Sequence, residues 1–357
     1  MNYATIFLMS QIEKRKLGWT DVEVSAICLG TMVWGNQTPE VDAHAQLSYG
    51  VDERGNNFID TAEAYPIPPS PELQGLTETY IGNWLTKRGK RDDIVIASKV
   101  CIADFVATRN TTRTYNLANI TEALDGSLAR LQTDYIDLYQ IHWPERKTNF
   151  FGARDYVHDT NDTSTPIRET LEALQTLIKA GKIRHIGISN ETPWGVSEYL
   201  RLAREEGLPR VVTIQNQYSL VNRHFETGLS EMAIRDKVGL LPYSVLSGGV
   251  LSGKYLGGAK PADSRFTLFE RNAARYNTDR LQGVVAAYVD VAKKHGLDPV
   301  QMAIAFVTNR DFVTSTIIGS RTLEQMKVCI DAGAMKLSNE VMADLQAVHE
   351  EYPNLQA

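Results

Sequence analysis

The chain has 357 residues, of which 43% are hydrophobic and 22% charged, and its net charge is -6. This is the composition of a globular protein large enough to bury a substantial core. It disfavours nucleic-acid binding, because the compact basic cluster Lys14-Arg15-Lys16 is too short to follow a phosphate backbone. The cysteines are far apart and form no C-x-x-C pair, which argues against a disulfide framework or a zinc site and fits a reducing cytoplasm.

The first residues carry no targeting signal. Residues 1–10 lack the basic start and the long apolar region of a secretion signal, and no apolar stretch is long enough to span a bilayer. We therefore predict a cytoplasmic protein with no membrane partner. We interpret residues 1–10 as a disordered extension, with Met9 a candidate for the natural first residue, and residues 11–357 as a single domain.

Short apolar runs alternate with amphipathic stretches along the chain, which predicts strands followed by helices. The first four pairs are 25–29 with 41–53, 57–60 with 77–87, 94–99 with 119–132, and 137–142 with 167–180. The next four are 185–189 with 193–206, 211–215 with 227–237, 239–243 with helices around 278–295 and 299–308, and 315–318 with 322–332. A further helix is predicted over 339–352 and a hairpin over 11–24.

Eight strand–helix units without a linker-like break predict an α/β fold, the (β/α)8 TIM barrel. Strands covered on both faces by helices need not alternate polar and apolar residues, which is the pattern here. The N-terminal hairpin is expected to cap the far end of the barrel, and the extra C-terminal helix to pack across it. Apolar stripes such as Ile120, Leu124 and Leu128 are interpreted as core.

Three of the early strands end near groups that can move or stabilise a proton: Asp60 with Tyr65 after it, Lys99, and His142. The carboxyl ends of neighbouring parallel strands meet around one mouth, which predicts an enzyme. A tyrosine, with a pKa of about 10, needs a nearby cation to donate a proton to a carbonyl oxygen near neutrality. Lys99 can supply that cation, Asp60 can keep it charged, and His142 can orient the carbonyl.

Each of these residues also has a purely structural interpretation. Asp60 alone suits a strand-end cap, Tyr65 a core residue, His142 a hydrogen-bonded buried histidine, and Lys99 a side chain that reaches solvent. Together they favour chemistry. A lysine that ends an apolar strand needs a partner, and Asp60 on the preceding strand provides one.

Several motifs in order resemble the aldo-keto reductase family, and within it the Tas-like members with long active-site loops. The resemblance runs from about Leu17 to the last helix and rests on segments 29–32, 60–65, 75–78, 97–100, 140–144, 187–190, 215–219 and 318–321. It implies that Tyr65 is the general acid/base, that Lys99 and Asp60 tune it, and that His142 positions the carbonyl of a small-molecule substrate. No metal is implied.

The resemblance also implies NADP(H), bound extended across the barrel mouth without a Rossmann fold. The nicotinamide end would be held by a donor and acceptor set and a stacking ring, Ser189, Asn190, Gln215 and Tyr243. Ser189 and Asn190 also read as the approach to a helix capped by Thr192, and both readings can hold together. The remaining contacts implied on this side are Thr31 and Met32.

The phosphate end of the cofactor is implied along two segments. The loop over the pyrophosphate would use main-chain N–H groups and the residues Ser244, Leu246, Gly248, Lys254 and Arg265. The helix after Gly319 offers an N-terminal anion site for the 2′-phosphate, with Arg321 as its clamp and Gln325 as an adenine contact.

Two features of the sequence bear on how the adenosine end of the cofactor would be bound. Thr322 and Gln325 also read as a capping box, a structural alternative for Gln325. Val328 and Cys329 stand where many relatives carry a polar pair that binds adenine, so the preference for NADPH over NADH is less firmly implied than the chemistry.

The substrate pocket is expected to be shaped by the proline-rich loop 66–71 and by the long loop 145–165. Trp34 and Trp143 border the predicted mouth and favour an apolar or aromatic aldehyde, although tryptophans near strand ends also serve as rim packing. Neither the physiological substrate nor the choice between monomer and homo-oligomer is specified by these patterns.

Three classes of function are compatible with the sequence. The leading hypothesis is an oxidoreductase that moves hydride from NADPH to an aldehyde or ketone. A second is a non-catalytic NADP(H)-binding regulatory subunit, against which the intact set Asp60, Tyr65, Lys99 and His142 argues. A third is a Schiff-base lyase with Lys99 as nucleophile, and borohydride trapping of substrate on Lys99 would identify it.

Overall fold

The computed structural model describes residues 12–102, 109, 114–151, 153, 155–269 and 279–354. At its centre lies an eight-stranded sheet in the order β10-β3-β4-β5-β6-β7-β8-β9, and every neighbouring pair is parallel. The strands are β3 (Ile27–Gly30), β4 (Phe58–Asp60), β5 (Val95–Val100), β6 (Ile136–Ile141), β7 (Ile183–Ser189), β8 (Thr213–Gln215), β9 (Gly239–Leu240) and β10 (Thr316–Gly319).

Hydrogen bonds join the two ends of this strand order and close the sheet into a (β/α)8 barrel. The main-chain N–H of Leu240 donates to Phe312 O at 2.9 Å, and Thr314 N–H donates to Leu240 O at 2.9 Å. A Cβ atom at Gly239 would lie 1.8 Å from Thr314 Oγ1, so only glycine allows this close approach. The predicted barrel is confirmed.

Helices follow the strands in chain order. The six barrel strands β3 to β8 are followed in turn by α1 (Glu40–Leu47) with the π-helix η1 (Ser48–Glu53), α2 (Leu76–Arg88), α3 (Leu117–Leu131), α4 (Ile167–Lys179), α5 (Pro193–Glu206) and α6 (Phe225–Arg235). The chain between β9 and β10 forms η2 (Ser247–Ser252), η3 (Leu256–Gly258), α7 (Arg265–Leu268), α9 (Asp279–Lys294) and α10 (Pro299–Thr308). The last two helices are α11 (Leu323–Ala332) and α12 (Asn339–Glu351).

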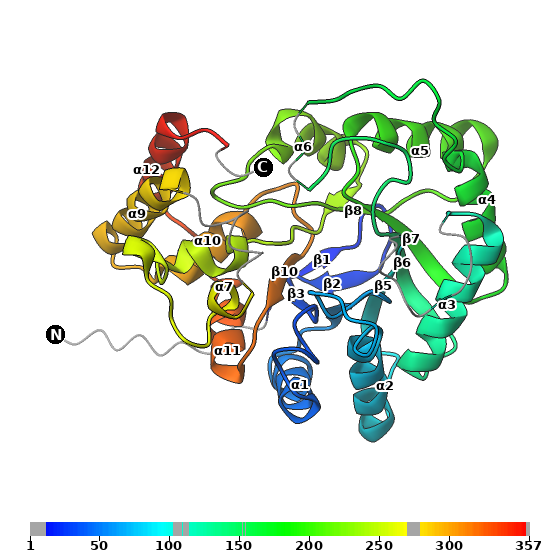
Figure 1. The fold of residues 1–357 in the computed structure, drawn as a ribbon, viewed down its shortest axis with the longest axis horizontal. Coiled ribbons are helices and arrows are strands. Elements are labelled where there is room, and N and C mark those ends of the chain that lie inside the picture. Colours follow the sequence, from blue (N-terminus) through cyan, green and yellow to red (C-terminus); the bar gives the residue numbers. More distant parts are fainter. Residues whose placement is uncertain are drawn as a thin grey trace.

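The helices surround the strands unevenly (Figure 1). Helices α1 to α5 form an arc around one side, whereas α7, α9, α10 and α12 gather on the other. Their sequences explain their boundaries and their buried faces. Thr192 accepts a hydrogen bond from Gly195 N at 3.3 Å and caps α5, as predicted, and Ile120, Leu124 and Leu128 are buried on α3.

The N-terminal hairpin pairs β1 (Lys14–Lys16) with β2 (Glu23–Ser25) in antiparallel register. Leu17 and Val24 of this hairpin pack in one buried cluster with apolar side chains from six positions around the barrel. Four of the strands contribute directly, and two residues lie directly next to β8 and β9: Cys28, Phe58, Val95, Ala97 and Leu138, with Val212 and Leu241. The hairpin therefore plugs the end of the barrel from which the strands start, as the sequence predicted.

Some boundaries differ from the prediction. Strand β9 stops after two residues, whereas 239–243 was expected, because Pro242 has no N–H to continue the ladder. Helix α12 packs beside α9, where Asp344 accepts hydrogen bonds from Lys294 at 2.7 Å and His295 at 2.5 Å. We predicted that this helix packs across the barrel, but it packs instead against the surrounding layer of helices.

The predicted extension of residues 1–10 lies outside the described residues. Among the helices that the structure does describe, none is both long enough and apolar enough to cross a membrane.

Candidate active site

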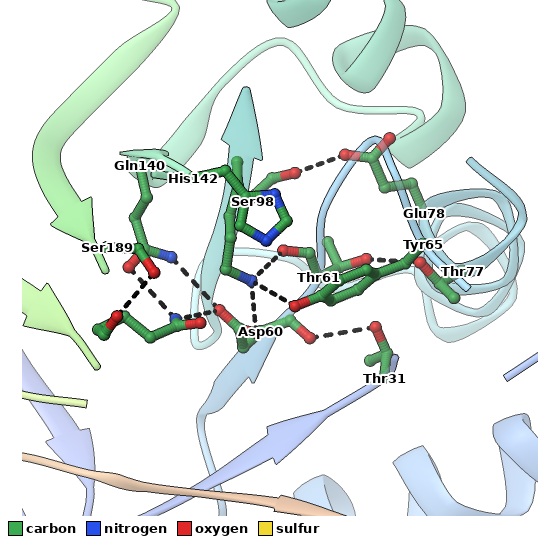
Figure 2. Close-up of polar contacts among 12 residues, drawn as sticks. Thr31, Asp60, Thr61, Tyr65, Thr77, Glu78, Ser98, Gln140, His142 and Ser189 are labelled. Atoms are coloured by element: carbon green, nitrogen blue, oxygen red, sulfur yellow. Dashed lines mark hydrogen bonds and ion pairs between the residues drawn. The ribbon is translucent and has the colours of Figure 1, made fainter. Parts of the chain in front are cut away.

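The predicted proton-handling residues meet at the carboxyl ends of β4, β5 and β6 (Figure 2). The Lys99 side chain is fully buried, and its ammonium donates to Asp60 Oδ2 at 2.7 Å, to Thr61 O at 2.8 Å and to Tyr65 Oη at 3.3 Å. His142 lies beside them, with its ring centroid 5.8 Å from that of Tyr65. The structure thus brings together all four residues that the sequence selected.

The charge on Lys99 is favoured by its neighbours. Burial lowers the pKa of Lys99, but the Asp60 carboxylate and the Tyr65 hydroxyl outweigh that effect and leave the pKa above its ordinary value. Lys99 is therefore an ammonium at neutral pH. Removing either charge of this buried pair would leave the other without compensation.

Tyr65 holds its proton tightly. Burial raises the pKa of Tyr65, Lys99 works in the opposite direction, and the net result is a pKa above the ordinary value near 10. The sequence correctly placed an acidifying lysine beside the phenol but could not weigh it against burial. At neutral pH Tyr65 is in the protonated form that a proton donor requires.

His142 is neutral at physiological pH. Burial and the nearby ammonium of Lys99 hold the pKa of His142 well below 6.5. Its Nδ1 atom is buried and has no hydrogen-bond partner within the described part of the chain. A neutral imidazole carries one N–H donor, which can bond a ligand carbonyl oxygen, and one acceptor nitrogen.

Asp60 is the centre of a wider hydrogen-bond network. Its Oδ2 accepts from Lys99, while its Oδ1 accepts from Gln215 Nε2 at 2.8 Å and from Gln140 Nε2 at 3.3 Å. Gln140 was not among the site residues predicted from the sequence. Strand alternation was the available signal, because Gln140 lies two residues before His142 on β6 and so faces the same side.

The residues implied for the nicotinamide end lie next to this network. Ser189 Oγ donates to Gln215 O at 2.7 Å, and Asn190 Nδ2 donates to His142 O at 2.9 Å. Tyr243 Oη donates to Asn190 Oδ1 at 2.6 Å. These polar groups, from β7, β8 and the segment after β9, therefore hold one another in place beside His142.

The segment implied for the pyrophosphate has the backbone that close approach to an anion needs. Gly248 and Gly249 have φ angles of 70° and 95°, a region that side chains disfavour, and a Cβ at Gly249 would lie 3.0 Å from Lys254 Nζ. Leu246 precedes these glycines and Ser244 also has a positive φ of 55°. Arg265 opens α7 a few residues further on.

Two cations on this side have no acidic partner in the described ranges. Neither Lys254 nor Arg321 forms an ion pair there, and Lys254 is exposed to solvent. The main chain of Arg321 is fixed, because its carbonyl accepts from Thr38 Oγ1 at 3.0 Å and Gln46 Nε2 at 3.2 Å. A glycine-lined turn and two unneutralised cations fit an anionic dinucleotide.

The start of α11 supports the capping interpretation of Gln325. Thr322 Oγ1 accepts from Gln325 N at 3.3 Å, and Gln325 Oε1 accepts from Arg321 N at 3.0 Å. Gly319 ends β10 just before this turn. Of the two residues that depart from the family pattern, Val328 is exposed and Cys329 is buried. Burial raises the pKa of the Cys329 thiol to about 11.

The remaining predicted residues fall into different environments. Thr31 Oγ1 donates to Asp60 O at 3.1 Å, and Met32 O accepts from Ile67 N at 3.0 Å, so both border the site. Trp143 is half-buried, and its ring centroid lies 4.7 Å from that of His142. Trp34 is wholly buried in the core, which favours its packing alternative over a pocket-lining role.

No group of three or more histidine, cysteine or acidic side chains is arranged to hold a metal ion in the part of the chain that the structure describes.

This fold and site agree with what known proteins show. A family model described as the aldo/keto reductase family matches residues 26–350, and the chain belongs to that family.

Individual relatives extend over most of the chain. Protein tas of Escherichia coli (strain K12) is 51% identical, over 96% of this chain and 99% of that protein. An uncharacterized oxidoreductase, YrpG of Bacillus subtilis (strain 168), is 34% identical, over 94% of this chain and 96% of that protein. Norsolorinic acid reductase stcV of Emericella nidulans is 28% identical, over 91% of this chain and 78% of that protein.

Proposed function

We propose that the protein is an NADPH-dependent reductase that converts aldehyde or ketone carbonyls to alcohols, with Tyr65 as the proton donor. One observation carries the proposal: the buried ammonium of Lys99 lies within hydrogen-bond distance of both Asp60 and the Tyr65 hydroxyl. Two relatives are named as an oxidoreductase and as a reductase, which supports the same reaction class.

The residues divide the proton chemistry among them. Tyr65 donates the proton of its hydroxyl to the carbonyl oxygen, and the phenolate that remains is stabilised by Lys99. Asp60 keeps Lys99 charged and in place. The neutral imidazole of His142 hydrogen-bonds the carbonyl oxygen and orients it toward Tyr65. When bound, NADPH supplies the hydride.

The cofactor would lie across the mouth from these residues. Ser189, Asn190, Gln215 and Tyr243 would hold its nicotinamide end, beside Thr31 and Met32. Ser244, Leu246, Gly248, Lys254 and Arg265 would surround the pyrophosphate, and Gly319 and Arg321 would face the 2′-phosphate. The unneutralised Lys254 and Arg321 support this direction of binding. We propose a cytoplasmic location and a small-molecule substrate, in line with the acidic composition and dispersed cysteines.

The protonation of Lys99 favours a reductase over a Schiff-base lyase. A nucleophilic lysine must be a free amine, whereas Asp60 and Tyr65 keep the pKa of Lys99 above its ordinary value. Borohydride added with an aldehyde should therefore leave no adduct on Lys99, and mass spectrometry of the digested protein would detect one.

The decisive experiment is a fluorescence titration with NADPH, followed by a panel of aldehydes and quinones assayed for NADPH consumption. We expect saturable binding and alcohol or hydroquinone product from at least one class. Binding without turnover on any carbonyl would instead favour the non-catalytic regulatory subunit, and absence of binding would refute both.

A further inference from the structure

Two acidic residues in the motifs around the site take no part in the proposed proton transfer. Glu63 lies between Asp60 and Tyr65 in the chain, and Glu78 lies in the first turn of α2. The side chains of both are fully buried. A buried carboxylate is costly unless it is paired and hydrogen-bonded, so the partners of Glu63 and Glu78 indicate what they do.

Both carboxylates hold the end of β5, one on each side of Lys99. Ser98 Oγ donates to Glu78 Oε1 at 2.5 Å, and the main-chain N–H of Cys101 donates to Glu63 Oε1 at 2.6 Å. Successive side chains of a strand point to opposite faces. Ser98 therefore points toward α2, on the outside of the barrel, while Lys99 points inward to Asp60 (Figure 2).

Each carboxylate is neutralised by an arginine. Arg130 of α3 donates from Nε to Glu78 Oε2 at 2.7 Å. Arg109 donates from Nε to Glu63 Oε2 and from Nη2 to Glu63 Oε1, both at 2.9 Å. We call Glu63, Glu78, Arg109 and Arg130 the β5 brace. Its charges sum to zero, and three of its four side chains are almost wholly enclosed.

The β5 brace also contacts the segment that carries Tyr65. The main-chain N–H of Gly75, at the start of α2, donates to Tyr65 O at 2.8 Å. Arg130 packs directly on this glycine, because a Cβ there would lie 2.6 Å from Arg130 Cδ. Thr61 and Thr77 share a hydrogen bond of 2.8 Å between their hydroxyls, which fastens the same segment to α2.

We propose that the β5 brace consists of positioning residues that hold Lys99 Nζ and Tyr65 Oη at their separation of 3.3 Å. One end of the brace fixes the strand that carries Lys99, and the other fixes the segment that carries Tyr65. This inference rests on the proposed reductase function, in which that separation governs proton transfer.

The titratable groups that face Tyr65 define what a loosened brace would change. They are Lys99, Asp60 and Cys101, with the neutral His142 beside the ring. Of these, only Lys99 favours the phenolate. If Lys99 moves away, Tyr65 holds its proton more tightly, so it donates less readily in reduction and is ionised less often in the reverse oxidation of an alcohol.

The test compares Glu78→Gln with a matched control, Asp137 of β6, which also holds a residue of β5. Like Glu78, Asp137 is buried and accepts hydrogen bonds from β5 and from an arginine. The β5 donor is the Ile96 main-chain N–H at 2.9 Å, where Glu78 has the Ser98 hydroxyl, and the arginine is Arg91 at 2.6 Å. This contact lies toward the opposite end of β5 from Lys99. Asp137→Asn therefore removes the same kind of interaction without touching the Lys99–Tyr65 pair.

In Glu78→Gln we expect kcat for reduction to fall about 10- to 100-fold, with the KM for NADPH unchanged within about twofold. The rising limb of the pH profile for alcohol oxidation should move about one unit to higher pH. Asp137→Asn should keep the wild-type kcat and pH profile. Equal losses of kcat in both variants, or a wild-type profile in Glu78→Gln, would overturn the inference.

Ser98→Ala provides a milder test if Glu78→Gln does not fold, because it leaves the Glu78–Arg130 pair intact. We expect a smaller shift of the pH profile in the same direction, and no shift would overturn the inference. A wild-type protein that reduces no carbonyl would instead refute the proposed function. Wild-type turnover combined with unmoved profiles in these variants would refute the positioning role alone.

Discussion

The two sides of the barrel mouth differ in how far their charges are satisfied before a ligand binds. At the ends of β4 and β5, Lys99 and Asp60 are buried and paired at 2.7 Å. After β9 and β10, Lys254 and Arg321 have no acidic partner among the described residues, and Lys254 is exposed. In the proposed function, the residues for proton transfer are therefore preorganised, whereas the cofactor side would be completed by an anionic ligand.

Tyr65→Phe would break the preorganised side and should have the largest effect. It removes the donor hydroxyl but keeps the ring beside Lys99 and His142. Turnover should fall about 10²- to 10⁴-fold, the usual contribution of a positioned acid. NADPH affinity, measured by fluorescence titration, should change by less than about twofold because the phosphate side is untouched. Unchanged turnover would defeat the assignment of Tyr65.

Arg321→Ala would break the other side and should separate the two cofactors. Without the guanidinium, the affinity for NADPH should fall about 10- to 100-fold, the scale of a lost charge-assisted contact, while the affinity for NADH should barely change. Lys327→Ala, on the helix α11 that follows Arg321, is a control for net charge, since Lys327 lies over the Tyr49 ring. Equal losses for both cofactors would mean that Arg321 does not read the 2′-phosphate.

The raised pKa of Tyr65 sets the pH dependence of reduction. The donor must be protonated, so kcat should stay level from pH 7 to about 10, the ordinary pKa of tyrosine, and then fall about tenfold per unit beyond the higher folded value. Stopped-flow measurement at saturating substrates would follow this limb. A fall that begins near pH 8 would show that another group controls the proton transfer.

The lowered pKa of His142 links the preorganised side to stability. The folded state resists protonation, whereas the unfolded histidine titrates near 6.5, so stability falls as pH drops through that value. Between pH 7.5 and 5.5 this costs up to about 1.4 kcal/mol. Urea unfolding should show that part of the loss in the wild type and not in His142→Gln. The same acid sensitivity in both proteins would show that His142 does not cause this loss of stability.

The surroundings of a residue could be predicted from the sequence where its position in a strand determines them. A lysine at the end of an apolar strand, preceded by a strand that ends in Asp60, was enough to predict the buried ion pair. The order of strands and helices was enough to predict the barrel. Alternation along β6 would also have identified Gln140, two residues before His142, as part of the same network.

Other features depend on contacts between distant segments. Glu78 and Arg130 are 52 positions apart, and nothing in either segment alone reveals their pairing. The pKa of Tyr65 depends on how completely the surrounding loops enclose it, which the sequence does not give. Trp34 was placed at the mouth because it follows a strand end, yet its side chain turns into the core.

Gly239, at the start of β9, affects where the barrel can open. Strand β9 has only two residues, and the seam between it and the segment that leads into β10 forms because Gly239 lacks a side chain that would clash with Thr314. Lys254 and Arg321 lie on the segments that leave either side of this seam. A dinucleotide bound by both cations would hold this seam closed. We therefore expect NADPH to slow hydrogen exchange at the amides that join Leu240 and Thr314.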